Sequence, residues 1–272
     1  MKKKVKIDPG HGGKDPGGVA NGLQEKNIVL DLSIEMKKYL DENYTDHETS
    51  LTRTTDVFIE LSERANIANR DGSDVFISNH VNAGGGTGYE SYIYTKPSAG
   101  SLKLQSLVNS EALTAAKKYG LGPHNDDSKQ GNLAVVRQTN MPAILTEIAY
   151  IDSKDAELLK NNNFIKDMAA AYARGVAKYL NLPAKQVVSN VVTDTKKYRL
   201  KTGVFPTAEA LVEGKKRLSE KYGWLLYEAP ESTNLDPGYR IITGTLTSKI
   251  VAEGYAEEIR KSFGWTVYVA ES

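Results

Sequence analysis

Two histidines and two glutamates stand at the ends of predicted strands or at the start of a helix. Together their side chains could hydrolyse an amide with the help of a metal. His11 follows the first predicted strand, and His80 and Glu147 each end a later one. Glu25 begins a helix, just after a glycine-rich loop. Because the carboxyl ends of parallel strands form the ligand crevice of an open sheet, separate strands can bring these groups together.

The types of these side chains favour a zinc site. Two imidazoles and one carboxylate bind zinc tetrahedrally and leave the fourth position for water, whose pKa the ion lowers towards ~7. On this interpretation His11, Glu25 and His80 are the ligands, and the choice of zinc over another divalent metal rests on ligand type. Glu147 lies outside the ligand set, where it can take the proton of water and pass it to the leaving amine.

Other interpretations of these residues fit the sequence less well. The segment GHGGKDPGG lacks both the G-x-G-x-x-G pattern and the Walker lysine pattern of phosphate-binding loops. The sequence contains no G-x-S-x-G nucleophile motif. Because it has no cysteine, thiolate nucleophiles, disulfides and cysteine-based zinc sites are excluded. The other histidines, His47 and His124, lie in polar segments and are predicted to be surface residues, although His124 could border the cleft.

The hydrophobic pattern predicts an α/β fold with a mostly parallel twisted sheet flanked by helices. Apolar residues alternate over 4–8, as in a strand, and recur at four-residue spacing over 25–43, as in an amphipathic helix. Strands are predicted over 4–8, 49–53, 74–80, 89–95, 132–136 and 142–147, and helices over 25–43, 60–70, 101–119 and 164–180.

The last third of the chain contains an internal repeat. YRLKTG at 198–203 matches YRIITG at 239–244, and YGWLLYEA at 222–229 matches FGWTVYVA at 263–270. Each copy is predicted to form a β-α-β unit, which makes a small C-terminal α+β domain. The predicted regions are a catalytic domain over 1–181, a linker over 182–197 and a domain with the internal repeat over 198–272.

The composition of the chain excludes several classes of partner. A formal net charge of +1 provides no strong basic field for nucleic acid. No apolar run approaches the roughly 20 residues that a membrane helix needs. The start MKKKVKID is basic like a signal peptide, but no apolar segment follows it. We therefore expect a chain made in the cytoplasm that binds neither nucleic acid nor membrane and reaches an external target only after lysis releases it.

Six ordered motifs resemble the zinc-dependent N-acetylmuramoyl-L-alanine amidases of the amidase-3 type. They run through residues 4–180 and read IDPGHGGKDPGG, NGLQEKNIVLDLS, LTRTTD, LSERANIAN, VFISNHVNA and MPAILTEIAYIDSKDAELL. The resemblance implies a mostly parallel sheet flanked by helices. It also implies cleavage of the amide between N-acetylmuramic acid and the L-alanine of the stem peptide in bacterial peptidoglycan.

The resemblance assigns the same site residues as the pattern of strand ends. His11, Glu25 and His80 match the family's zinc ligands, and Glu147 matches its catalytic glutamate. Asn82 matches a position near the substrate, where a residue that only forms the turn after the strand is an equally good interpretation.

Further matches and departures concern the surroundings of the site. Arg64 matches a family arginine, for which we expect a structural ion pair. After the catalytic glutamate the family usually has Gly-Phe and later Asn, whereas this chain has Ala149, Tyr150 and Ser153. We expect these changes to adjust packing rather than chemistry. The span between residues 80 and 147 is too short for a long regulatory insert, which predicts an open site.

The C-terminal copies resemble the SPOR-type repeats of amidases that lyse the mother-cell wall in sporulating bacilli. The resemblance rests on the duplicated Y-R-x-x-T-G and G-W-x-x-Y patterns and implies peptidoglycan binding. Tyrosine and tryptophan faces can pack on sugar rings while their polar tips form hydrogen bonds. Trp224 and Trp265 occupy equivalent places in the two copies, where a core role and a sugar-binding role are equally good interpretations.

The sequence therefore predicts a zinc amidase of bacterial cell-wall peptidoglycan with a C-terminal wall-binding domain. A phage endolysin and a sporulation autolysin both fit this prediction. Two other hypotheses stay open, namely a different zinc peptidoglycan peptidase and a non-catalytic wall-binding protein that keeps the fold. The complete set of four site residues argues against a non-catalytic protein, and the reaction products would separate the two enzymes.

Overall fold

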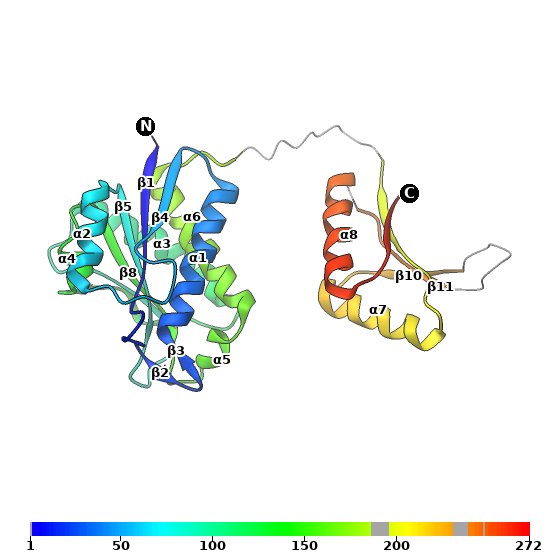
Figure 1. The fold of residues 1–272 in the computed structure, drawn as a ribbon, viewed down its shortest axis with the longest axis horizontal. Coiled ribbons are helices and arrows are strands. Elements are labelled where there is room, and N and C mark those ends of the chain that lie inside the picture. The colour runs from blue at the N-terminus through cyan, green and yellow to red at the C-terminus, as the bar shows by residue number, and fades with distance from the viewer. Residues whose placement is uncertain (1, 186–195, 231–238, 247) are drawn as a thin grey trace. The chain divides into compact units, whose positions relative to one another are not determined.

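The computed structural model describes residues 2–185, 196–230, 239–246 and 248–272. The chain divides into two units, Met1–Gln186 and Val187–Ser272 (Figure 1). Among the described residues, none of the helices combines the length and the apolar character that a bilayer span requires.

A six-stranded sheet forms the centre of the first unit, in the order β4-β1-β5-β8-β6-β7. Its strands are β1 (Lys3–Pro9), β4 (His47–Leu51), β5 (Val75–Asn82), β6 (Tyr89–Tyr94), β7 (Pro123–Gly131) and β8 (Ala143–Tyr150). Neighbouring strands are parallel except β6 and β8, which run antiparallel. The short strands β2 (Val19–Ala20) and β3 (Leu23–Gln24) form a separate hairpin. The predicted mostly parallel sheet is therefore confirmed.

Helices cover both faces of this sheet (Figure 1). One face packs on α1 (Glu25–Asn43), α3 (Ala99–Lys117) and α6 (Asn162–Leu180), and the other on α2 (Leu61–Asp71) and α4 (Ala134–Arg137). A short α5 (Ala156–Leu159) precedes α6. The central strand β5 is buried on both faces. Val75 and Ile77 pack in the hydrophobic core formed with α1, α3 and α6, whereas Phe76, between them in the sequence, packs in the smaller core formed with α2 and α4.

The predicted strand over 132–136 is wrong. Ala134–Arg137 forms a helical turn, α4, and Val135 and Val136 are both buried in the same cluster as Phe76. A strand would point two successive side chains to opposite faces, whereas a helical turn lets both reach one face. The edge strand is instead β7 (Pro123–Gly131), whose sequence PHNDDSKQG gives no hydrophobic signal.

The second unit contains a four-stranded antiparallel sheet in the order β10-β11-β9-β12. The first copy supplies β9 (Tyr198–Thr202), α7 (Ala208–Tyr222) and β10 (Leu226–Pro230), and the second β11 (Tyr239–Thr243), α8 (Lys249–Phe263) and β12 (Val267–Glu271). The two predicted β-α-β copies are confirmed. Each copy's last strand pairs with the first strand of the other copy, so the copies interlock and share one hydrophobic cluster.

Both tryptophans of the second unit pack on this shared cluster. Trp224 stacks on Tyr222 with ring centroids 4.5 Å apart, and Trp265 stacks on Phe263 at 4.8 Å. The two pairs occupy equivalent places in the two copies. Of the two interpretations of the tryptophans, the packing favours the core role.

The predicted linker over 182–197 falls partly outside the described residues, which resume at 196. Its first residues pack on the first unit, because Leu182 is buried in the main core and the backbone N–H of Lys185 donates to the carbonyl of Asn43 at 2.7 Å.

Candidate active site

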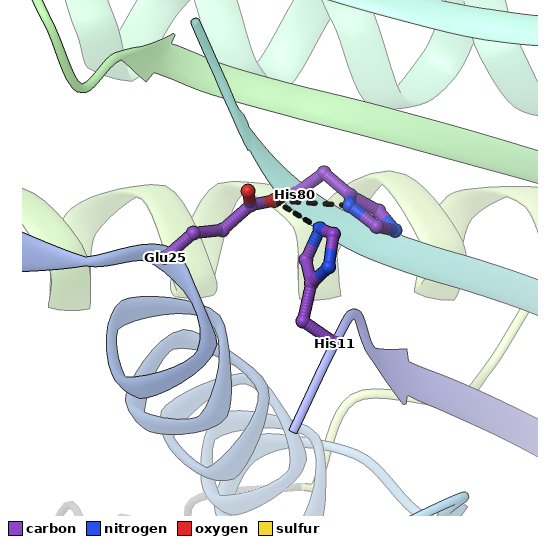
Figure 2. Close-up of side chains that lie close together, drawn as sticks. All are labelled: His11, Glu25 and His80. Atoms are coloured by element: carbon purple, nitrogen blue, oxygen red, sulfur yellow. Dashed lines mark hydrogen bonds and ion pairs between the residues drawn. The ribbon is translucent and has the colours of Figure 1, made fainter. Parts of the chain in front are cut away.

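His11, Glu25 and His80 meet at the carboxyl end of the sheet (Figure 2). Glu25 Oε1 lies 3.1 Å from His11 Nε2 and 3.0 Å from His80 Nδ1. The two imidazole rings stand edge to face, with centroids 4.9 Å apart. One ligand atom from each residue lies within 4.8 Å of the others, and no second cluster of this kind occurs among the described residues.

The distances within this cluster fit a zinc ion. Ligand atoms bound tetrahedrally at about 2.0–2.1 Å from zinc lie about 3.3 Å from one another. The two separations from Glu25 Oε1, 3.0 and 3.1 Å, are close to that value, and all three ligand atoms lie within 4.8 Å of one another. Two imidazole nitrogens and one carboxylate oxygen are one of the donor sets found in catalytic zinc sites.

Glu25 is buried and anionic. Its Oε1 accepts the backbone N–H of Val81 at 2.9 Å, and its Oε2 accepts that of Gly18 at 2.8 Å. Burial by itself would raise the pKa of this carboxyl group. The hydrogen bonds and charges of His11 and His80 outweigh burial and hold the pKa of Glu25 well below its usual range.

Asp15 orients the ring of His11. Its Oδ2 lies 2.9 Å from His11 Nδ1, which leaves Nε2 to face Glu25, as a metal ligand requires. Burial favours the neutral ring, but hydrogen bonds and charges from Glu25 and Asp15 outweigh it and raise the pKa of His11. The sequence analysis did not select Asp15. A carboxylate four residues after a histidine in one loop is the signal that could have found it.

Two glycines leave the space that the cluster occupies. A Cβ atom on Gly10 would lie 2.3 Å from Cε1 of His80. A Cβ atom on Gly17 would lie 2.5 Å from Oε2 of Glu25 and 2.7 Å from Cδ2 of His11. Any larger residue at either position would therefore displace a side chain of the cluster.

Arg64 forms the predicted structural ion pair. Its Nη1 donates to Asp8 Oδ1 at 2.9 Å, and both side chains are buried. The same guanidinium donates to the carbonyl of Pro9 at 2.7 Å and to that of His11 at 2.6 Å. Arg64 thus also fixes the backbone of the loop that carries His11.

Arg53 joins the two segments that carry His11 and Glu25. Its Nη2 donates to the carbonyl of Gly10 at 2.7 Å and to that of Lys26 at 2.9 Å. These carbonyls belong to the residues next to His11 and Glu25. The sequence analysis did not select Arg53, because nothing local to LTRTTD indicates contacts with segments so far along the chain.

Glu147 lies beside the cluster on β8. It is the register partner of His80 on β5 and of Glu90 on β6. Its side chain is partly exposed, but its Oε2 is buried with no hydrogen-bond partner among the described residues. Burial raises the pKa of Glu147 well above its usual value, and the charges of Glu25 and Glu90 add to this effect. A raised pKa makes the carboxylate a stronger base, although a bound cation would oppose the shift.

Asn82 lies two residues beyond His80 on the same strand and is partly exposed. Its Nδ2 donates to Glu90 Oε1 at 2.7 Å, and its Oδ1 accepts the backbone N–H of Ala83 at 2.8 Å. The structure thus places it beside the site, bound to a buried carboxylate.

His47 and His124 lie outside the cluster. His47 is half-buried in β4, where Nε2 lies 3.1 Å from the carbonyl of Leu40. His124 Nδ1 lies 2.9 Å from the carbonyl of Thr87, and its ring packs against Tyr150 with centroids 4.9 Å apart. Tyr150, one of the departures from the family pattern, is buried and forms this contact with His124.

Comparison with known proteins identifies the family. Residues 5–178 match the family model described as N-acetylmuramoyl-L-alanine amidase. The chain belongs to this amidase family. The matched segment ends before the second unit and contains all five site residues predicted from the sequence.

Relatives of the family resemble about two thirds of the chain. A sporulation-specific N-acetylmuramoyl-L-alanine amidase of Bacillus subtilis is 42% identical over 180 residues, which are 66% of this chain and 69% of the relative. An endolysin of Bacillus phage SPP1 is 44% identical over 189 residues, 68% of this chain and 69% of the relative.

A solved structure agrees with the fold of the first unit. The catalytic domain of the amidase CwlV from Bacillus (Paenibacillus) polymyxa var. colistinus superposes with a TM-score of 0.61 at 31% identity. The match covers 66% of this chain and 99% of that domain.

Proposed function

We propose that the first unit is a zinc-dependent N-acetylmuramoyl-L-alanine amidase. It hydrolyses the amide between N-acetylmuramic acid and the first L-alanine of the peptidoglycan stem peptide. The observation that carries this proposal is the cluster of His11, Glu25 and His80, whose ligand atoms lie within 4.8 Å of one another beside Glu147. Membership of the amidase family supports the choice of substrate.

Each site residue then has a distinct role. His11, Glu25 and His80 hold the ion, and Asp15 keeps the ring of His11 in the tautomer that binds it. Bound zinc would polarise the scissile carbonyl group and lower the pKa of water. Glu147 takes a proton from the attacking water and delivers it to the amine of L-alanine as that amine leaves.

Analysis of the products tests this function against its rivals. Purified wall is treated with wild type and with Glu147→Gln, and the new amino termini are labelled and identified. The amidase predicts new L-alanine termini without new reducing sugars, and their loss in the variant. Amino groups released elsewhere in the stem or bridge would indicate a peptidase. No new termini from metal-loaded wild type would leave only the wall-binding protein.

We further propose that the second unit consists of SPOR-type repeats that bind the glycan strands of peptidoglycan. Its two helices contribute to one cluster on one face of the sheet, as the alternating burial of β9 reflects. On the sheet, Arg199 lies 5.8 Å from the ring centroid of Tyr227, and Arg240 lies 6.0 Å from that of Tyr268. Both tyrosines are half exposed and occupy equivalent places in the two copies.

These tyrosines support sugar binding better than the tryptophans do. An exposed aromatic face can pack on a pyranose ring, and a neighbouring guanidinium can donate hydrogen bonds to its hydroxyl groups. A unit that binds wall in this way would raise the local concentration of the catalytic unit at its polymeric substrate.

A further inference from the structure

A buried carboxylate lies next to the proposed catalytic glutamate and belongs to none of the six motifs quoted above. Glu90 on β6 is the register partner of Glu147, which in turn is the register partner of His80. Residues paired in this way point to the same face of a sheet. The three side chains therefore form a row across β5, β8 and β6, and Glu90, which is 1% exposed, is at the end of the row next to the edge strand β7.

Three side chains bind the carboxylate of Glu90. Its Oε1 accepts two hydrogen bonds, one from Nδ2 of Asn82 at 2.7 Å and one from the hydroxyl of Tyr92 at 2.7 Å. Its Oε2 forms an ion pair with Lys129 of the edge strand β7, whose side chain is 26% exposed. A buried charge is tolerated when it is paired and hydrogen-bonded. Lys129 provides the opposite charge, and Asn82 and Tyr92 provide hydrogen bonds.

These contacts fix the orientation of the Asn82 amide. Its Oδ1 already accepts the backbone N–H of Ala83, and one of its two N–H donors is used by Glu90. A flipped amide would place Oδ1 against the carboxylate of Glu90, where two acceptors would repel each other. The second N–H has no partner among the described residues, and Asn82 is partly exposed two residues beyond His80.

We propose that Glu90 is a positioning residue. It holds the amide of Asn82 so that the second N–H donates to a carbonyl oxygen of the stem peptide beside the scissile bond, and Lys129 supplies the charge that keeps Glu90 in place. The role of Asn82 towards the stem peptide rests on the proposed amidase function. The orientation of Asn82 by Glu90 does not.

A double-mutant cycle tests whether Glu90 acts through Asn82. Asn82→Ala and Glu90→Ala should each lower kcat/KM by about 10- to 100-fold, because small displacements at a reacting site cost that much. When each variant is compared at its own pH optimum, because the charge of Glu90 also raises the pKa of Glu147, the double variant should be no slower than Asn82→Ala alone. If the two losses multiply instead, Glu90 acts independently of Asn82 and the proposal is overturned.

A neutral pair of similar shape provides a second variant in case Glu90→Ala folds poorly. In Glu90→Gln/Lys129→Met the glutamine oxygen can still accept from Asn82, and no cation remains opposite the new amide. This variant should recover most of the activity lost in Lys129→Met alone. Failure to recover, in a folded protein with full metal content, would show that the charge itself is needed and would overturn the positioning role.

The mobility of the Asn82 side chain gives a readout that needs no activity. In ¹⁵N relaxation, its side-chain amide should be rigid in wild type, and its order parameter should fall below about 0.6, the range of flexible groups, in Glu90→Ala. The Asn82→Ala spectrum assigns the resonance. An unchanged order parameter overturns the proposal even if the chain is an amidase. If wild type releases no L-alanine termini, the amidase function fails, while this measurement still decides whether Glu90 fixes Asn82.

Discussion

Removing the carboxylate of Asp15 should weaken zinc binding without unfolding the site. Of the three residues in the cluster, Asp15 forms a hydrogen bond only with His11, whose Nδ1 lies 2.9 Å from Asp15 Oδ2. The other carboxylate oxygen, Oδ1, accepts the backbone N–H of Gly17 at 3.0 Å. In Asp15→Ala the ring loses the partner that fixes its tautomer. Asp15→Asn keeps a neutral acceptor for the ring and should show a smaller loss.

The size of the effect follows from the exposure of Asp15. Partners of this kind typically contribute 10- to 100-fold to metal affinity. The side chain of Asp15 is 43% exposed, so solvent screens its charge and the loss should lie at the lower end. We expect the dissociation constant for zinc to be about tenfold larger in Asp15→Ala, which corresponds to a loss of about 1.4 kcal/mol of binding free energy.

The effect should depend on pH in a definite direction. Burial favours a neutral His11, but Glu25 and Asp15 outweigh it and raise the pKa, so at low pH a proton competes with the metal. Loss of Asp15 lowers this pKa and relieves that competition. The loss of affinity should therefore be larger near pH 8 than near pH 6.

Competition with a chromophoric chelator measures this affinity directly. Asp56→Asn is a matched control, because Asp56 accepts the N–H of Gly13 in the same loop but does not contact His11. The control should bind zinc as wild type does. Equal affinities of Asp15→Ala and wild type at pH 8 would refute the idea that Asp15 orients the ligand.

Contacts elsewhere lead to three more expectations. Arg53→Lys loses the forked contact between the His11 loop and the start of α1, so zinc affinity in the same assay should fall about tenfold. Burial alone would raise the pKa of Glu111, but Lys178 and Arg174 hold it below its usual 4.5. Glu111→Gln should therefore lower the melting temperature at pH 7, and the difference should vanish as pH falls below 4.5 and wild type loses the same charge. Tyr227→Ala and Tyr268→Ala should each weaken co-sedimentation with purified wall, and more so together.

Each of these expectations has a contrary outcome. Unchanged zinc affinity in Arg53→Lys would mean that the loop keeps its position without the guanidinium. A melting-temperature difference for Glu111→Gln that persists at the acidic end of the series would assign it to packing rather than charge. Wall binding that survives both tyrosine substitutions would move the contact away from these two residues.

The sequence predicts well the strands and the helix that carry the cluster, because apolar periodicity places them, although β5 and β8 continue two and three residues beyond His80 and Glu147. The helix predicted over 25–43 is α1, Glu25–Asn43, and its first residue is the buried carboxylate of the cluster. The strands that carry His80 and Glu147 are buried on both faces, so their hydrophobic signal is strong.

Features without an apolar pattern were not predictable in the same way. The edge strand β7 is polar throughout and supplies Lys129, which the sequence analysis did not select. Arg53 and Glu90 act through contacts that depend on sheet register and loop closure. Neither of these can be inferred from the neighbouring residues in the sequence.

A zinc titration of metal-free protein tests the central claim most directly. The ion is removed and returned in steps, and new L-alanine termini on purified wall are counted at each step. The single ligand cluster among the described residues predicts a linear rise that saturates at one zinc per chain, and no recovery in Glu25→Gln at that ratio. Full release of L-alanine termini from metal-free wild type would contradict the proposed mechanism.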